Sequence, residues 1–168
     1  MIKGTTRLQR ICWIVFLFYI VGLLYFTIFA EAFGRAPGDT SEAARYNLVP
    51  FNEIKRFIMY RKQLGMKAFM LNVVGNVAAF IPAGFMLPAI SRRSRRLVGL
   101  AAVGFMLSFF IECTQIVFRA GSFDVDDLML NTLGAVLGFM LNRLVQKHRI
   151  RKKRKKKPDV VVRKINGD

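Results

Sequence analysis

The sequence has few acidic residues and few cysteines. Its 168 residues hold 10 Asp and Glu against 27 Lys and Arg, with two Cys and one His. Two cysteines are too few for a disulfide scaffold. Intrinsic disorder is excluded as well, because 16 Phe and a 54% hydrophobic content are the reverse of its signature. That content leaves Gly out, yet it already exceeds the ~45–50% of a soluble domain with Gly included.

Charge is absent from four long stretches. Residues 11–30, 68–91 and 128–142 contain no charged residue, and 97–118 contain only Glu112. A helix needs about 20 apolar residues to cross a bilayer. Four such runs would leave a soluble helical protein without a polar face for water. The sequence therefore predicts an all-α membrane protein with four transmembrane helices, at about 11–30, 68–90, 97–118 and 125–145.

The first hydrophobic run also resembles a cleaved signal peptide. Basic residues precede it, and Ala30-Glu31-Ala32 is similar to a cleavage site. The hydrophobic region of a signal peptide is about 7–15 residues long, whereas this run has no charge through residues 11–30. We therefore interpret it as a retained first helix.

The distribution of basic residues predicts the orientation. They precede the first run, fill residues 92–96 and dominate the tail, whereas residues 119–127 carry Asp124, Asp126 and Asp127. By the positive-inside rule both termini are cytoplasmic. Residues 31–67, with seven basic and four acidic residues, are a partial conflict. We predict a transmembrane domain over residues 1–145 and a polybasic cytoplasmic tail over 146–168.

The polybasic tail is open to two interpretations. Anionic lipid is the partner that a basic segment next to a membrane span favours. Nucleic acid is the alternative, but the tail has no interleaved aromatic residues, so we predict no nucleic-acid partner.

Residues 50–62 have an amphipathic pattern. Phe51, Ile54 and Phe57 fall on one side of a helix, and Glu53 and Arg56 fall on the other. This pattern predicts an interfacial helix lying on the outer leaflet. A short helix packed against the bundle is the alternative.

Polar side chains within the predicted spans are the candidate functional residues. Glu112 is the sharpest, because a carboxylate in a transmembrane helix is costly and usually functional. At about 100° per residue, Glu112, Gln115 and Arg119 share one helical face. We predict an outward-facing pocket whose candidates are Asn76, Glu112, Gln115, Arg119, Asp124, Asp126, Asp127 and Asn131. The alternative is an interhelical hydrogen-bond cluster in which Glu112 is neutral or paired with Arg119.

Three sequence blocks resemble the VanZ-like family of bacterial membrane proteins. The first block is residues 47–51, the second runs from Asn76 through 88, and the third is the acidic and amide series from Glu112 to Gly138. The residues assigned structural roles by these blocks are Asn47, Pro50, Phe51, Phe80, Pro82, Gly84, Gly134 and Gly138. Gly134 and Gly138 form a GxxxG motif, which lets a second helix approach closely.

The resemblance implies a multi-pass protein of the bacterial cell membrane, from a family whose eponymous member is associated with teicoplanin resistance. The resemblance does not supply a mechanism. Our first hypothesis is lower susceptibility to glycopeptide or lipoglycopeptide antibiotics, with the outward-facing pocket binding a lipid-linked or glycopeptide ligand. One alternative is a membrane enzyme acting on a lipid-linked phosphate or cell-wall precursor. No cofactor is expected, although Asp126 and Asp127 offer hard oxygen ligands for Mg²⁺ or Ca²⁺. A structural module that recruits a partner is the other alternative.

Overall fold

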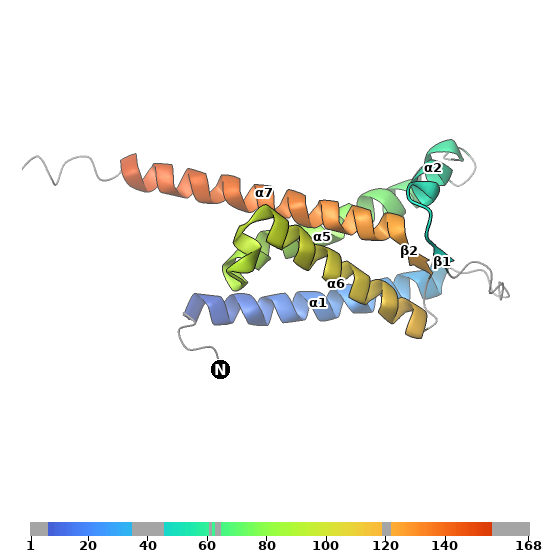
Figure 1. Cartoon of the computed structure of the whole chain (residues 1–168), viewed down its shortest axis with the longest axis horizontal. Helices are drawn as coiled ribbons and strands as arrows, with labels where there is room; N and C mark the ends of the chain where they lie inside the picture. Colours follow the sequence, from blue (N-terminus) through green and yellow to red (C-terminus); the bar gives the residue numbers. More distant parts are fainter. Residues whose placement is uncertain (1–6, 35–45, 61, 63–64, 119–121, 156–168) are drawn as a thin grey trace, which may run out of the picture.

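The computed structural model describes residues 7–34, 46–60, 62, 65–118 and 122–155. Most of them are helical (Figure 1). The elements in chain order are α1 (Arg7–Gly34), β1 (Tyr46–Asn47), α2 (Asn52–Met59), α4 (Met66–Phe69), a π-helical turn (Met70–Val74), α5 (Gly75–Ile90), a 3-10 turn (Arg93–Arg95), α6 (Leu97–Val117), β2 (Phe123–Asp124) and α7 (Val125–Lys155).

The four predicted transmembrane helices are confirmed. The stretches Gln9–Thr27, Met70–Ile90, Leu97–Val117 and Val125–Lys152 are helical, long and apolar enough to cross a membrane. Large apolar side chains also point outward, and Val98 is 82% exposed and Phe18 is 74% exposed. In water such faces would be unfavourable, whereas in a bilayer they contact lipid.

The helical bundle has two opposite ends, and different segments of the chain lie at each of them (Figure 1). The start of α1, the turn between α5 and α6, and the C-terminal part of α7 gather toward one end of the molecule, while α2, β1 and β2 lie at the other. The segments predicted to be cytoplasmic therefore share one end. Which side of the membrane that end faces stays a prediction.

Among the described helices, α5 and α7 are the most closely packed pair, because glycines let their backbones approach each other. A Cβ atom added to Gly134 would lie 2.1 Å from the carbonyl oxygen of Val77, and one on Gly138 would lie 2.0 Å from that of Ile81. From the other helix, a Cβ on Gly84 would lie 1.8 Å from the carbonyl oxygen of Ala135. A side chain at any of these glycines would push the two helices apart.

The remaining core is apolar and small. Phe80 packs with Leu23 and Ile111, and Leu87 packs with Leu100 and Phe139. Helix α1 lies at the periphery and contacts mainly α5. There the Tyr19 hydroxyl donates a hydrogen bond to the carbonyl of Ala79.

Several helix boundaries differ from the predicted ones, and α1 extends beyond 11–30 at both ends, to Arg7–Gly34. Helix α7 continues to Lys155 rather than ending at 145. Residues 146–155 are mainly Lys, Arg and Gln, which are good helix formers, and basic residues are favourable at a helix C-terminus. The predicted helix at 50–62 is confirmed with shorter bounds, as α2. Its Phe57 is buried and the helix contacts α4 and α7, as expected of a helix packed against the bundle.

Candidate functional site

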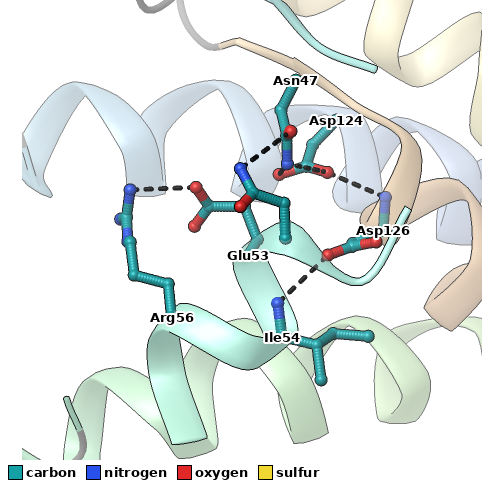
Figure 2. A network of polar contacts seen from close by, with 7 residues as sticks. Asn47, Glu53, Ile54, Arg56, Asp124 and Asp126 are labelled. Carbon is teal, nitrogen blue, oxygen red and sulfur yellow. Dashed lines mark hydrogen bonds and ion pairs between the residues drawn. The ribbon is translucent and has the colours of Figure 1, made fainter. Parts of the chain in front are cut away.

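The polar site begins where the loop before α7 meets the segment before α2. Strand β1 pairs in parallel with β2, with Tyr46 opposite Phe123 and Asn47 opposite Asp124. The side chains of that second pair also bond, because the Asn47 amide Nδ2 lies 3.1 and 3.2 Å from the two carboxylate oxygens of Asp124 (Figure 2). Segments 77 residues apart in the sequence are thereby joined.

Asp124 also caps α7. It is the residue before the helix, and its Oδ1 accepts a hydrogen bond of 2.8 Å from the backbone N–H of Asp126 in the first turn. Aspartate is a preferred N-cap because its carboxylate satisfies an N–H that has no partner within the helix. Asp126 and Asp127 follow in that first turn, where the helix dipole favours negative charge.

Asp126 reaches across to cap a second helix. Its Oδ2 accepts a 3.0 Å hydrogen bond from the backbone N–H of Ile54, and its Oδ1 accepts one from the N–H of Phe51. Phe51 is the N-cap of α2, with a φ of 65°, and its side chain has no oxygen that could cap the helix. This left-handed conformation is unfavourable for a phenylalanine. Asp126 is only 1% exposed, and its carboxylate therefore stabilises a turn that has no capping side chain of its own.

Glu53 and Arg56 of α2 face the same cluster (Figure 2). An Arg56 nitrogen lies 2.9 Å from a carboxylate oxygen of Glu53. Burial raises the pKa of Glu53, and the nearby Asp124 and Asp126 raise it further, against the opposing effect of Arg56. Burial likewise raises the pKa of Asp124, against the hydrogen bonds from Asp126 and Asn47 that lower it.

These residues border a pocket of about 540 Å³ at the α2 end of the bundle. Four carboxylates and one guanidinium lie in its described lining. The lining residues are Tyr46, Asn47, Asn52, Glu53, Ile54, Arg56, Phe57, Asn72, Val73, Ser122, Asp124, Asp126, Asp127 and Leu130. The described part of the pocket is therefore acidic, and it favours a ligand with a cationic or hydrogen-bond-donating group.

A second polar layer supports the pocket from within the bundle. Glu112 is 2% exposed, and its carboxylate accepts a 3.2 Å hydrogen bond from the backbone N–H of Asp124. Asn76 of α5 donates a hydrogen bond to the carboxylate of Asp127. Asn131 of α7 donates one of 2.9 Å to the hydroxyl of Ser108 on α6. These contacts tie α5, α6 and α7 together beneath the pocket.

The structure therefore divides the candidates from the sequence into groups. Asp124, Asp126 and Asp127 line the pocket. Asn76, Glu112 and Asn131 make the supporting contacts just described. Gln115 is buried on α6 but is not among the lining residues. Arg119 lies outside the described residues, so its predicted pairing with Glu112 stays a prediction.

The residues assigned structural roles are distributed along the bundle and the loop. Phe80 is buried in the core, and Gly84, Gly134 and Gly138 form the α5–α7 contact. Pro82 lies inside α5, and Pro50 is exposed just before the strained Phe51. Asn47 belongs to the site itself, because it binds Asp124 and lines the pocket.

Sequence reasoning missed Glu53, Arg56 and Asn52 as site residues. They fall on the polar side of an amphipathic helix, which the pattern assigns to water. Only the contact between α2 and the start of α7 turns that side toward the carboxylates. The Asn47 amide, with Asn52 donating to it at 3.3 Å, extends the network toward the exposed rim.

A metal ion would have to compete with this network for its ligands. Both carboxylate oxygens of Asp126 already accept backbone hydrogen bonds. Within the described ranges no group of three or more His, Cys, Asp or Glu is arranged to hold a metal ion. Cys12 and Cys113 are free thiols.

Four apolar helices with a polar site closing one end of their bundle define a helical membrane protein. The chain belongs to the VanZ/LLP1 family, which matches residues 16–146. Protein VanZ from Enterococcus faecium is 28% identical over 135 residues, covering 80% of this chain and 75% of that protein. No solved structure matches the chain. The family resemblance is therefore confirmed, and the matched region includes both the bundle and the site.

Proposed function

We propose that this protein is a multi-pass protein of the bacterial cell membrane that lowers susceptibility to glycopeptide or lipoglycopeptide antibiotics such as teicoplanin. It would act through the pocket at the α2 end, which the positive-inside rule assigns to the outer face. Membership of the VanZ/LLP1 family supports the cellular role. The observation that carries the proposal is the acidic pocket itself, with Glu53, Asp124, Asp126 and Asp127 in one lining.

The side chains in the described part of the pocket suit a peptide-like or glycopeptide ligand. Carboxylates bind ammonium groups and accept hydrogen bonds from amides and hydroxyls. Tyr46 in the lining is exposed and apolar, and the exposed Leu48 and Val49 directly follow the lining residue Asn47 in the chain. A ligand with polar donors and an apolar portion, lying at the membrane surface, would match both features.

A second candidate is a membrane enzyme acting on a lipid-linked cell-wall precursor. The observation that favours it is the raised pKa of Glu53 and of Asp124, since shifted pKa values gather where proton transfer occurs. The excess of carboxylates opposes it for a phosphate substrate, because like charges repel unless a cation intervenes.

Deletion and re-expression in the host test the first candidate. We expect the deletion strain to be more susceptible to teicoplanin and the re-expressing strain to recover. Profiles of lipids and wall precursors measured in parallel test the second candidate. Unchanged susceptibility in the deletion strain, with an accumulating lipid-linked precursor, would favour the enzyme and contradict the resistance role.

A further inference from the structure

A basic groove lies at the opposite end of the bundle, where α5 turns into α6. The 3-10 turn Arg93–Arg95 folds back on the first turn of α6, so that a Cβ on Gly99 would lie 2.3 Å from the carbonyl oxygen of Arg93. Ser94 is fully buried, and the Arg95 Nε donates a 3.3 Å hydrogen bond to the carbonyl of Pro88. The turn is therefore anchored to both helices.

This anchoring holds the other arginines of the turn at the mouth of an open groove of about 780 Å³. Arg92, Arg93 and Arg96 line the groove at that end. Its apolar lining follows α6 through Val98, Ala102 and Met106. Residues four apart share one face of a helix, so these side chains form a lane about 12 Å long at 1.5 Å per residue.

The start of α6 adds to the positive potential of the mouth. Its N-cap Arg96 makes no side-chain capping bond, and its first turn contains no acidic residue. The N–H groups of a helix's first turn have no carbonyl partner within the helix and carry a partial positive charge. Three exposed guanidinium groups beside such a turn are complementary to a phosphate rather than to a neutral or cationic group.

We infer that this groove binds one anionic phospholipid from the leaflet at this end of the bundle. The phosphate lies among Arg92, Arg93 and Arg96, and one acyl chain follows Val98, Ala102 and Met106 along α6. A free phosphate would use only the arginines and leave the apolar lane uncovered. The inference is independent of the pocket at the α2 end, because the two sites share no residue.

The test is native mass spectrometry of the purified full chain in detergent, titrated with phosphatidylglycerol. The groove variant is Arg92→Gln with Arg93→Gln and Arg96→Gln. We expect its affinity to fall roughly 100-fold, because each basic residue at an anionic surface contributes about a fivefold gain. The control variant Lys55→Gln, Lys62→Gln and Lys67→Gln removes the same charge from exposed positions outside both the groove and the basic tail, and it should bind near the wild-type level. Equal losses in both variants would overturn the groove in favour of diffuse charge.

A second variant keeps every arginine and fills the lane. Ala102 is exposed, so Ala102→Phe leaves the core intact while occupying the path of the acyl chain. We expect it to weaken phosphatidylglycerol binding, and we expect phosphatidylcholine and millimolar inorganic phosphate not to displace the bound lipid. Unchanged binding in Ala102→Phe, or displacement by inorganic phosphate, would show a simple phosphate site and contradict the inference.

Discussion

The carboxylate of Asp126, in the first turn of α7, accepts the backbone N–H of Ile54, which lies 72 residues earlier in the chain, at 3.0 Å. The same carboxylate accepts the N–H of Phe51. One acidic side chain thus fixes the start of α2 relative to the start of α7, and with it the walls of the acidic pocket. Asp126 has a positioning role, because it shapes the pocket through the backbone of α2.

Replacing Asp126 with alanine should therefore loosen α2. A buried N–H that loses its acceptor costs about 1–3 kcal/mol. We expect Asp126→Ala to lower the thermal midpoint of the purified protein and to expose residues 46–60 to limited proteolysis. Lys55→Ala, an exposed position in the same helix, is the matched control and should change stability by less than about 0.5 kcal/mol. Equal protease resistance in the two variants would contradict this role.

The contact between α5 and α7 should tolerate no side chain at Gly138. In Gly138→Ala the added Cβ would meet the backbone oxygen of Ile81 at 2.0 Å, so the helices must separate. We expect a loss of about 1–3 kcal/mol, typical of overpacking. Gly22→Ala is the control, because its Cβ would meet nothing within 4 Å. That change should be neutral or gain up to about 1 kcal/mol from helix propensity. The thermal midpoints in detergent decide the comparison.

Stability should depend on pH through Glu53. Its pKa is raised from the ordinary 4.5, mainly by burial. At a pH between the unfolded and the folded pKa, the folded state therefore holds a proton that the unfolded state has lost. This contribution to stability is fully present below the unfolded pKa and is lost as the pH rises through the folded pKa. We expect the thermal stability of Glu53→Gln relative to wild type to increase as the pH rises above the unfolded pKa. A difference in midpoint that stays constant as the pH rises would contradict the raised pKa.

The orientation of the bundle can be tested with single cysteines in a background lacking Cys12 and Cys113. Lys55→Cys, exposed on α2, should react with a membrane-impermeant maleimide in intact cells. Arg92→Cys, exposed at the other end, should react only after the cells are opened. Ser94 lies in the same turn as Arg92 but is fully buried, so a cysteine at position 94 would not be labelled from either side of the membrane. Labelling of Arg92→Cys in intact cells would reverse the topology.

Much of the fold could be predicted from the sequence, because the absence of charge over about 20 residues is a direct physical requirement of a membrane span. The end of α7 was less predictable. Apolar content stops near residue 145, but helix propensity continues through the basic residues that follow. The length of a membrane span and the length of the helix that contains it therefore differ, and the hydrophobic pattern predicts only the length of the span.

The site was only partly predictable. Helical periodicity places Asp126 near the outer end of α7, but it cannot show that its partners are the N–H groups of Phe51 and Ile54. Those contacts depend on where the chain before α2 returns to the bundle. For the same reason Glu53 and Arg56 were assigned to water, although they face the carboxylates.

The most direct test of the central claim is teicoplanin susceptibility in a deletion strain that expresses single variants at measured abundance. Glu53→Gln removes a pocket carboxylate, whereas Lys55→Gln changes an exposed residue outside the pocket lining of the same helix. We expect both proteins to accumulate normally, and we expect only Glu53→Gln to fall to the susceptibility of the deletion strain. Equal protection by the two variants at equal abundance would contradict a role for the acidic pocket.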